Sequence, residues 1–334
     1  MTTVPFKIAA AAGALFVCGV VAAAQQTNSP AQEYVPTRTV RLGLLVTDKS
    51  NHSVDDIKKD ELQVVEDKVP QTISAFLKDD RAIDYALVID NSGSFKDILA
   101  PAIEAAKLLI KNNGPTDEVF IERFISSNKV QTVEEFTSDQ SKLIKALGTL
   151  YIEGGQSAVV DAVYLAARHV IEHPPGTDRR RALVLISDGE DRASYYSVDD
   201  LFKLLRINDV QIFVIGIVTQ LAKEGGLIRP SPRATAAKLL NRIAQETGGR
   251  VFLPRNIEEL QGATTEIAHD LHTQYVINYQ PTNNSGKAGF RKVEIRIAET
   301  PGRVGLKVFA RSGYLVTPEQ SMAKENEQKK KKSE

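Results

Sequence analysis

Between residues 83 and 271, short apolar runs alternate with longer stretches whose apolar residues recur at helical spacing. The apolar or β-rich runs are 85–90, 118–126, 129–136, 181–187, 210–218 and 250–254, and the helical stretches are 95–111, 138–150, 158–173, 198–205, 234–247 and 257–271. Short apolar runs bounded by polar residues are typical of buried parallel strands, and the helices between them supply crossover connections. The pattern predicts an α/β domain with a doubly wound, mostly parallel six-stranded sheet and helices on both faces.

On both sides of this region the pattern changes to that of strands alone. The runs 39–47, 62–66 and 71–77 precede it, with a turn at 66–68, and the runs 274–279, 291–297, 303–309 and 314–316 follow it. Each group alone is too small to bury a stable core. We therefore expect residues 38–80 and 272–317 to form one β-module, which the domain of residues 81–271 interrupts.

The N-terminal residues 1–24 have the order of a secretory signal peptide. Lys7 precedes an apolar run from Ile8 to Val21, and three alanines follow it at 22–24. A membrane anchor is the alternative, but the run is shorter than the roughly 20 residues that a span needs. We expect cleavage, export to the periplasm or the extracellular space, and no membrane span in the mature chain.

Composition adds three constraints. The chain has 334 residues and a formal net charge of zero, which gives no electrostatic reason to expect a nucleic-acid partner. Its one cysteine, Cys18, lies in the predicted signal peptide, so the mature chain would have neither disulfides nor a cysteine metal site. Residues 25–37 are polar and read as a linker, and the Lys/Glu-rich residues 318–334 are predicted to be a disordered tail.

Three oxygen-bearing side chains, Asp90, Ser92 and Ser94, follow the first strand of the α/β region at alternate positions. A turn can direct side chains at this spacing toward one point. Hard oxygen ligands of low total charge suit Mg2+ or Ca2+ rather than zinc or copper. The same side chains could instead cap a helix that begins at Phe95, because Asp and Ser are common N-cap residues.

Two later motifs could complete such a site. Gly154-Gly155-Gln156-Ser157-Ala158 opens a helix, and the strand that ends at Ser187 continues as Asp188-Gly189. Together with the D-x-S-x-S turn, and in the same order, these motifs resemble the von Willebrand factor type A domain and its metal-ion-dependent adhesion site. The flanking segments 66–71, 275–279 and 311–314 also resemble those of a group of secreted bacterial proteins with a related domain.

This resemblance implies a single divalent cation, with Mg2+ expected and Mn2+ or Ca2+ possible. The implied ligands are Asp90, Ser92, Ser94, Ser157 and Asp188. Ser92 and Ser94 would bind the ion directly, whereas the two acids would hold it largely through water. The family usually has Thr where this chain has Ser157, and one residue fewer after the glycine pair. A serine is less restricted in rotamer than a threonine, which predicts a lower affinity here.

The function that the resemblance implies is adhesion: a carboxylate from a protein or peptide ligand completes the coordination of the ion. The insertion at 219–233 follows the end of a predicted strand and is expected to border the same face. The alternatives are a cell-envelope scaffold or assembly factor with metal-independent contacts, and a metal-assisted hydrolase. We expect no enzyme, because Ser157 is not in a G-x-S-x-G motif and the glycines form neither a P-loop nor a dinucleotide fingerprint.

Several other polar residues have simpler interpretations. Glu190 and Asp191 could tune the ion, but we expect them to begin the next helix, where acids are favourable. His169 and His173 have the spacing of a zinc-binding pair but lack a companion carboxylate motif, so a solvated helix end is expected. The same interpretation applies to His269 and His272.

Overall fold

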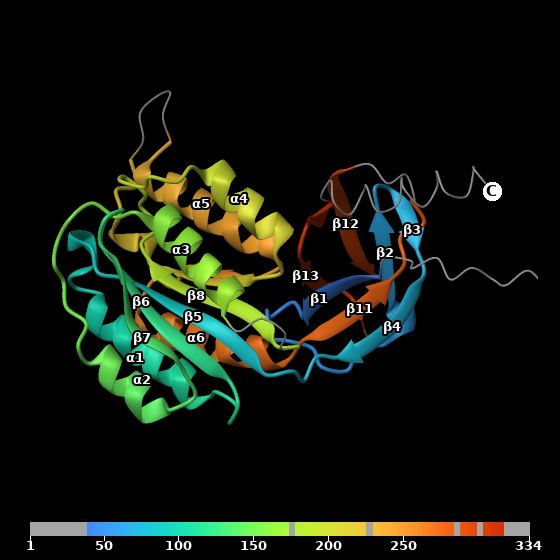
Figure 1. The fold of residues 1–334 in the computed structure, drawn as a ribbon, viewed down its shortest axis with the longest axis horizontal. Coiled ribbons are helices and arrows are strands. Elements are labelled where there is room, and N and C mark those ends of the chain that lie inside the picture. Colours follow the sequence, from blue (N-terminus) through green and yellow to red (C-terminus); the bar gives the residue numbers. More distant parts are fainter. Residues whose placement is uncertain (1–38, 174–177, 225–229, 284–287, 299–302, 317–334) are drawn as a thin grey trace, which may run out of the picture. The chain divides into compact units, whose positions relative to one another are not determined.

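The computed structural model describes residues 39–173, 178–224, 230–283, 288–298 and 303–316 (Figure 1). The predicted signal peptide, linker and tail lie outside these residues, as do residues 225–229 of the predicted insertion. Among the described residues, no helix combines the length and the apolar character that crossing a membrane requires.

A six-stranded sheet forms the centre of the α/β region. Its strands are, in spatial order, β10 (Val251–Phe252), β9 (Gln211–Gly216), β8 (Arg180–Ser187), β5 (Ile83–Asp90), β6 (Glu118–Phe124) and β7 (Val130–Thr137). Neighbouring strands are parallel except for the hairpin of β6 and β7. This sheet confirms the predicted doubly wound, mostly parallel fold.

Helices cover both faces of the sheet (Figure 1). One face packs against α1 (Leu99–Lys111), α2 (Gln140–Leu147) and α6 (Ile257–His272), and the other against α3 (Val159–Glu172), α4 (Val198–Ile207) and α5 (Pro232–Thr247). Successive side chains of a strand point to opposite faces. On the fully buried strand β5, Ala86 and Val88 face α3. Asp84 and Asp90 are an even number of residues away from Ala86 and Val88. These two acids therefore lie on the same face, one near each end of the strand.

The flanking strands form two antiparallel sheets. The first has the order β13 (Lys307–Ala310), β1 (Val40–Thr47), β11 (Tyr275–Tyr279) and β4 (Ile73–Lys78). The second has the order β14 (Gly313–Val316), β12 (Gly289–Ile297), β2 (Leu62–Glu66) and β3 (Val69–Gln71). Each sheet combines strands from before and after the α/β region, and residues of both sheets share one hydrophobic core.

One buried carboxylate connects the three flanking segments that the sequence singled out. The hydroxyl groups of Tyr279 and Tyr314 both donate to Oε2 of Glu66, at 2.7 and 2.9 Å. Glu66 itself is almost completely buried. Because a buried carboxylate is stable only when it is hydrogen-bonded, these contacts tie the N-terminal strands to the C-terminal ones.

Three element boundaries differ from the sequence-based expectation. The expected strand at 71–77 begins two residues later, as β4, and the short strand β3 just before it was not predicted. Helix α2 begins at Gln140 rather than at residue 138, because Asp139 caps it: the Asp139 side chain accepts from the backbone N–H groups of Ser141 and Lys142. Helix α1 begins at Leu99 rather than Phe95, because the chain first makes a short 3-10 turn over Gly93–Phe95.

Candidate functional site

The end of strand β5 turns sharply around the side chain of Asp90. This residue is fully buried, and its Oδ1 accepts a hydrogen bond from the backbone N–H of Ser92 at 2.9 Å. The residue before α1 is Ile98, and no side chain caps that helix. Asp90, Ser92 and Ser94 are therefore not used as caps of α1, which removes the simplest alternative to a ligand role.

Serine hydroxyls from two other segments meet the second oxygen of Asp90. Oδ2 accepts from the hydroxyl of Ser187 at 2.7 Å and from that of Ser157 at 3.2 Å. Within the turn itself, the hydroxyl oxygens of Ser92 and Ser94 lie 3.1 Å apart. The end of β5, the start of α3 and the end of β8 thus converge on one carboxylate.

The glycine pair before Ser157 allows the α3 loop to approach the β5 turn closely. Gly154 and Gly155 have φ values of 84° and 120°, a range that favours glycine. A Cβ atom on Gly155 would lie 2.7 Å from the Cγ2 atom of Ile125, and the Cβ position of Gly93 is 3.7 Å from the Cα of Gly154. A side chain at Gly155 would therefore be both strained in its backbone conformation and in collision with Ile125.

Asp188 follows β8 directly and is also fully buried. Its Oδ1 accepts from the backbone N–H of Glu190 at 2.9 Å. Its Oδ2 is buried and has no hydrogen-bond partner among the described residues. An orphaned buried carboxylate oxygen is costly unless a cation or a donor satisfies it.

Burial raises the pKa of both acids, and the charge of Asp188 adds to the rise at Asp90. The pKa of Asp90 is raised from its ordinary value of 3.8 to about 6, first by burial and second by the negative charge of Asp188. The pKa of Asp188 is also raised, mainly by burial, although the nearby Ser94 side chain opposes the rise. The one guanidinium that acts on Asp188, that of Arg192, forms its ion pair with Glu190.

The structure therefore brings together all five residues predicted from the sequence, namely Asp90, Ser92, Ser94, Ser157 and Asp188. All the candidate ligand atoms are oxygens, and two neighbouring carboxylates are buried together with hydroxyl groups. This set of oxygen ligands fits a hard divalent cation, which would neutralise both acids and whose bound water would satisfy the orphaned oxygen of Asp188.

Ser187 is a site residue that the sequence analysis did not assign. It is the last residue of β8 and donates to Asp90, and its hydroxyl oxygen accepts from the backbone N–H of Gly189 at 3.0 Å. Its position immediately before Asp188, at the carboxyl end of a parallel strand, is the signal that could have identified it.

Glu190 and Asp191 do not begin a helix as expected. Helix α4 starts later, at Val198, with Ser197 as its N-cap. Asp191 accepts from the backbone N–H of Val160 at 3.3 Å, in the first turn of α3. The loop that contains them is also tied to Ser157, whose carbonyl accepts from the backbone N–H groups of Arg192 and Ala193.

Comparisons with known proteins identify the domain. Residues 84–266, more than half of the chain, match the von Willebrand factor type A domain family. No curated protein matches.

Similar solved structures include three of low sequence identity. An aerotolerance-related membrane protein from Bacteroides fragilis is 21% identical, with 57% of this chain and 98% of that chain covered and a TM-score of 0.45. A von Willebrand factor type A protein from Catenulispora acidiphila is 14% identical, with 84% of this chain and 74% of that chain covered and a TM-score of 0.45. The third structure is proximal thread matrix protein 1 from the mussel byssus, with a zinc-occupied MIDAS motif. It is 19% identical, with 60% of this chain and 48% of that chain covered and a TM-score of 0.46.

The family match begins on β5 and ends within α6, so it spans the six-stranded sheet and the loops that carry the Asp90 cluster. Domains of this family typically mediate protein interactions. The chain belongs to the von Willebrand factor type A domain family.

Proposed function

We propose that the protein is an exported, non-enzymatic binding module that grips a carboxylate of a protein or peptide ligand through a divalent cation. The cation-binding residues are Asp90, Ser92, Ser94, Ser157 and Asp188. The observation that carries the proposal is the burial of Asp90 beside Asp188, with hydroxyl groups gathered around them and an orphaned oxygen on Asp188. Export rests on the signal-peptide pattern of residues 1–24.

Each residue has a role that follows from its chemistry. The hydroxyls of Ser92 and Ser94 are neutral ligands, and Ser157 supplies a third hydroxyl. Asp90 and Asp188 balance the charge of the ion, largely through water. With few carboxylates bound directly, Mg2+ stays electrophilic and prefers a further oxygen ligand, which an acidic side chain of a partner provides.

The surface near this site also suits a protein ligand. Tyr195 is 84% exposed and Tyr151 is 53% exposed, which is unusual for large aromatic side chains. Tyr151 is linked to the β5 turn because its carbonyl accepts from the side chain of Asn91 at 2.8 Å. The backbone N–H of Tyr195 donates to Asp161 in α3 at 2.8 Å, so its loop is held in place. Exposed tyrosines on ordered loops are frequent binding hot spots.

The first test measures thermal unfolding of the mature chain with and without Mg2+. At 100 times Kd, bound Mg2+ should add about 2.7 kcal/mol to the free energy of unfolding. The double variant Ser92→Ala/Ser94→Ala should remain folded and lose this stabilisation. A matched control, Ser138→Ala/Ser141→Ala, changes two exposed serines near the start of α2 and should keep it. If the Ser92/Ser94 variant is stabilised as much as the control, the site assignment is wrong.

The second test asks whether ligand binding needs the ion. The immobilised mature chain should capture its ligand from an envelope extract with Mg2+, and release it with EDTA. The Ser92→Ala/Ser94→Ala variant should capture none of it. Capture that is unaffected by both EDTA and the double substitution would instead favour a scaffold or assembly factor with metal-independent contacts.

A further inference from the structure

The opposite end of strand β5 holds a second group of potential ligands. Asp84 on β5 is the register partner of Glu118 on β6, in a parallel pair. Register partners on adjacent strands point to the same face and are separated by about 4.8 Å. Two carboxylates are thereby fixed side by side under helix α3, at the opposite end of the strands from Asp90.

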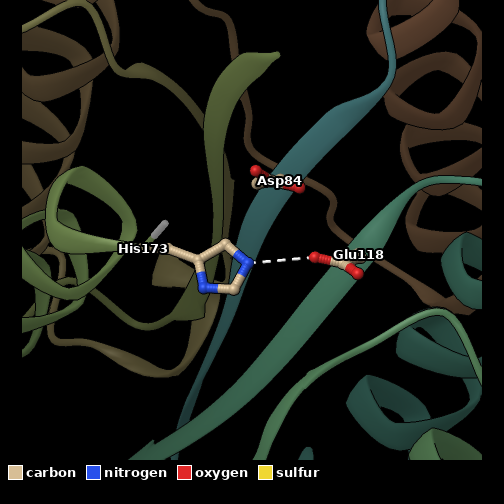
Figure 2. Close-up of side chains that lie close together, drawn as sticks. All are labelled: Asp84, Glu118 and His173. Atoms are coloured by element: carbon tan, nitrogen blue, oxygen red, sulfur yellow. Dashed lines mark hydrogen bonds and ion pairs between the residues drawn. The ribbon is translucent and has the colours of Figure 1, made fainter. Parts of the chain in front are cut away.

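Helix α3 ends above this pair and adds a nitrogen ligand. His173 is its C-cap residue, and the imidazole Nε2 lies 2.9 Å from Oε2 of Glu118. One ligand atom from each of Asp84, Glu118 and His173 lies within 4.8 Å of the other two. Figure 2 shows the three side chains close together, on β5, on β6 and at the end of α3.

The three side chains range from buried to partly exposed. The side chain of Asp84 is 6% exposed, that of His173 is 18% exposed and that of Glu118 is 37% exposed. A cation can therefore reach the group from outside and still bind a buried carboxylate, as a coordination site requires.

Neighbouring groups orient two of the three ligands. Nε of Arg179 donates to Oδ1 of Asp84 at 2.6 Å, and no hydrogen bond to Oδ2 is formed among the described residues. The ring of Phe136 stacks on the ring of His173, with 3.6 Å between the centroids. The imidazole ring is thereby fixed, as the rings of metal-bound histidines are, and Oδ2 of Asp84 stays open to a cation although Arg179 holds Oδ1.

Charges of both signs lie at this end of the sheet. The C-terminus of a helix carries a partial negative charge, and α3 directs this end toward two acids. Arg179 supplies one positive charge and is shared with the backbone carbonyl of Thr116, at 2.7 Å. Arg181 on β8 is the register partner of Asp84 on its other side, so the two carboxylates and the helix end face two guanidinium groups.

We propose that Asp84, Glu118 and His173 form a second divalent-cation site, of the zinc class, separate from the Asp90 cluster. One imidazole nitrogen and two carboxylate oxygens, with water in the fourth position, make a tetrahedral set that suits Zn2+. The ion would join β5, β6 and the end of α3, with one coordination position left to water.

The test uses the Ser92→Ala/Ser94→Ala protein as its parent, so that the Asp90 cluster is disabled. Equilibrium dialysis with Zn2+ should give one bound ion per chain, and Co2+ should give the intense visible absorption of a tetrahedral complex. Adding Glu118→Gln or His173→Gln should weaken Zn2+ binding at least tenfold and abolish the Co2+ spectrum.

His169→Gln is the matched control, because His169 lies one turn earlier on α3, stacks on Phe136 and pairs with Glu135 at 2.9 Å. It belongs to no group of three potential ligands among the described residues, so this variant should bind Zn2+ as its parent does. Circular dichroism establishes that each variant is folded.

Undiminished Zn2+ binding by both the Glu118→Gln and His173→Gln proteins would overturn the proposal. Equal weakening by His169→Gln would also overturn it, because it would indicate binding to surface histidines in general. Neither result would affect the function proposed for the Asp90 cluster, since the parent protein lacks that site in every measurement.

Discussion

The two ends of the β5–α3 unit combine the same elements with different chemistry. Asp90 and Asp84 lie on one strand and one face, below the N-terminal and C-terminal ends of the same helix. Asp90 is surrounded by hydroxyls and a second acid, whereas Asp84 is paired with Arg179 and lies beside an imidazole. The fold provides two places where acids are buried, and the neighbouring donor atoms decide which cation each can hold.

The largest expected effect is on the pH dependence of stability at the Asp90 end. The folded-state pKa of Asp90, about 6, is above its ordinary value of 3.8. The folded protein therefore binds this proton more tightly than the unfolded chain, so its contribution to stability is present below pH 4 and is lost as pH rises through 6. The difference is about 3 kcal/mol in the metal-free protein.

Urea unfolding in EDTA at pH 4.5 and pH 7 measures this contribution. The variant Asp90→Asn should be less sensitive to pH than the natural protein, and Mg2+ should bind the natural protein about tenfold more weakly for each pH unit below 6. Equal pH sensitivity of the two proteins would mean that Asp90 is ionised without penalty, against the burial and the neighbouring acid that raise its pKa.

The next largest effect is expected at the Asp84 end. Arg179→Gln leaves the buried carboxylate of Asp84 without its ion pair, which should lower the free energy of unfolding by about 2 kcal/mol. Arg168→Gln is the control, because Arg168 pairs with Glu172 on the exposed surface of α3 and should change stability by less than about 0.5 kcal/mol. Denaturant titration in EDTA compares the two variants.

The Arg179→Gln protein also sharpens the second-site proposal. Without the guanidinium, Asp84 and Glu118 should attract Zn2+ more strongly, so Zn2+ should raise the melting temperature of this variant more than that of the natural protein. Identical Zn2+ shifts in the two proteins would show that Asp84 does not contribute to any cation site.

The smallest expected effect concerns Ser157. Threonine at this position keeps the hydroxyl that contacts Asp90 but has fewer rotamers to lose. The gain is about 0.5 kcal/mol, which corresponds to roughly a twofold higher affinity for Mg2+ in Ser157→Thr. Isothermal titration calorimetry can resolve this change, and a large loss of affinity would show that the added methyl group does not fit beside Asp90.

The sequence was sufficient for the α/β fold and for the grouping of the five predicted ligands, because each depends on local pattern, but it did not identify Ser187. Apolar runs identified the strands, and all five predicted ligands stand at strand ends or helix starts. The start of α1 was predicted four residues too early, because Phe95 and Ile98 are buried and keep helical spacing although the chain forms a 3-10 turn there.

Other features depend on tertiary structure and have no local signal. Asp84, Glu118 and His173 are far apart in sequence, and only the β5–β6 register and the length of α3 bring them together. The short strand β3 was missed because its three residues, Val69–Gln71, form no β-rich run, and it becomes a strand only by pairing with β2.

The hydrogen bonds of Glu66 impose an order on folding. This residue is separated from Tyr279 by 213 positions and from Tyr314 by 248. During synthesis or translocation from the N-terminus, β1 and β2 emerge long before β11, β12 and β14, so their edges stay unpaired and open to aggregation until the last strands arrive. In sequence, the α/β region lies between the two groups of strands and can fold before the second group is made. The N-terminal strands would then be attached to a folded domain until the C-terminal strands pair with them.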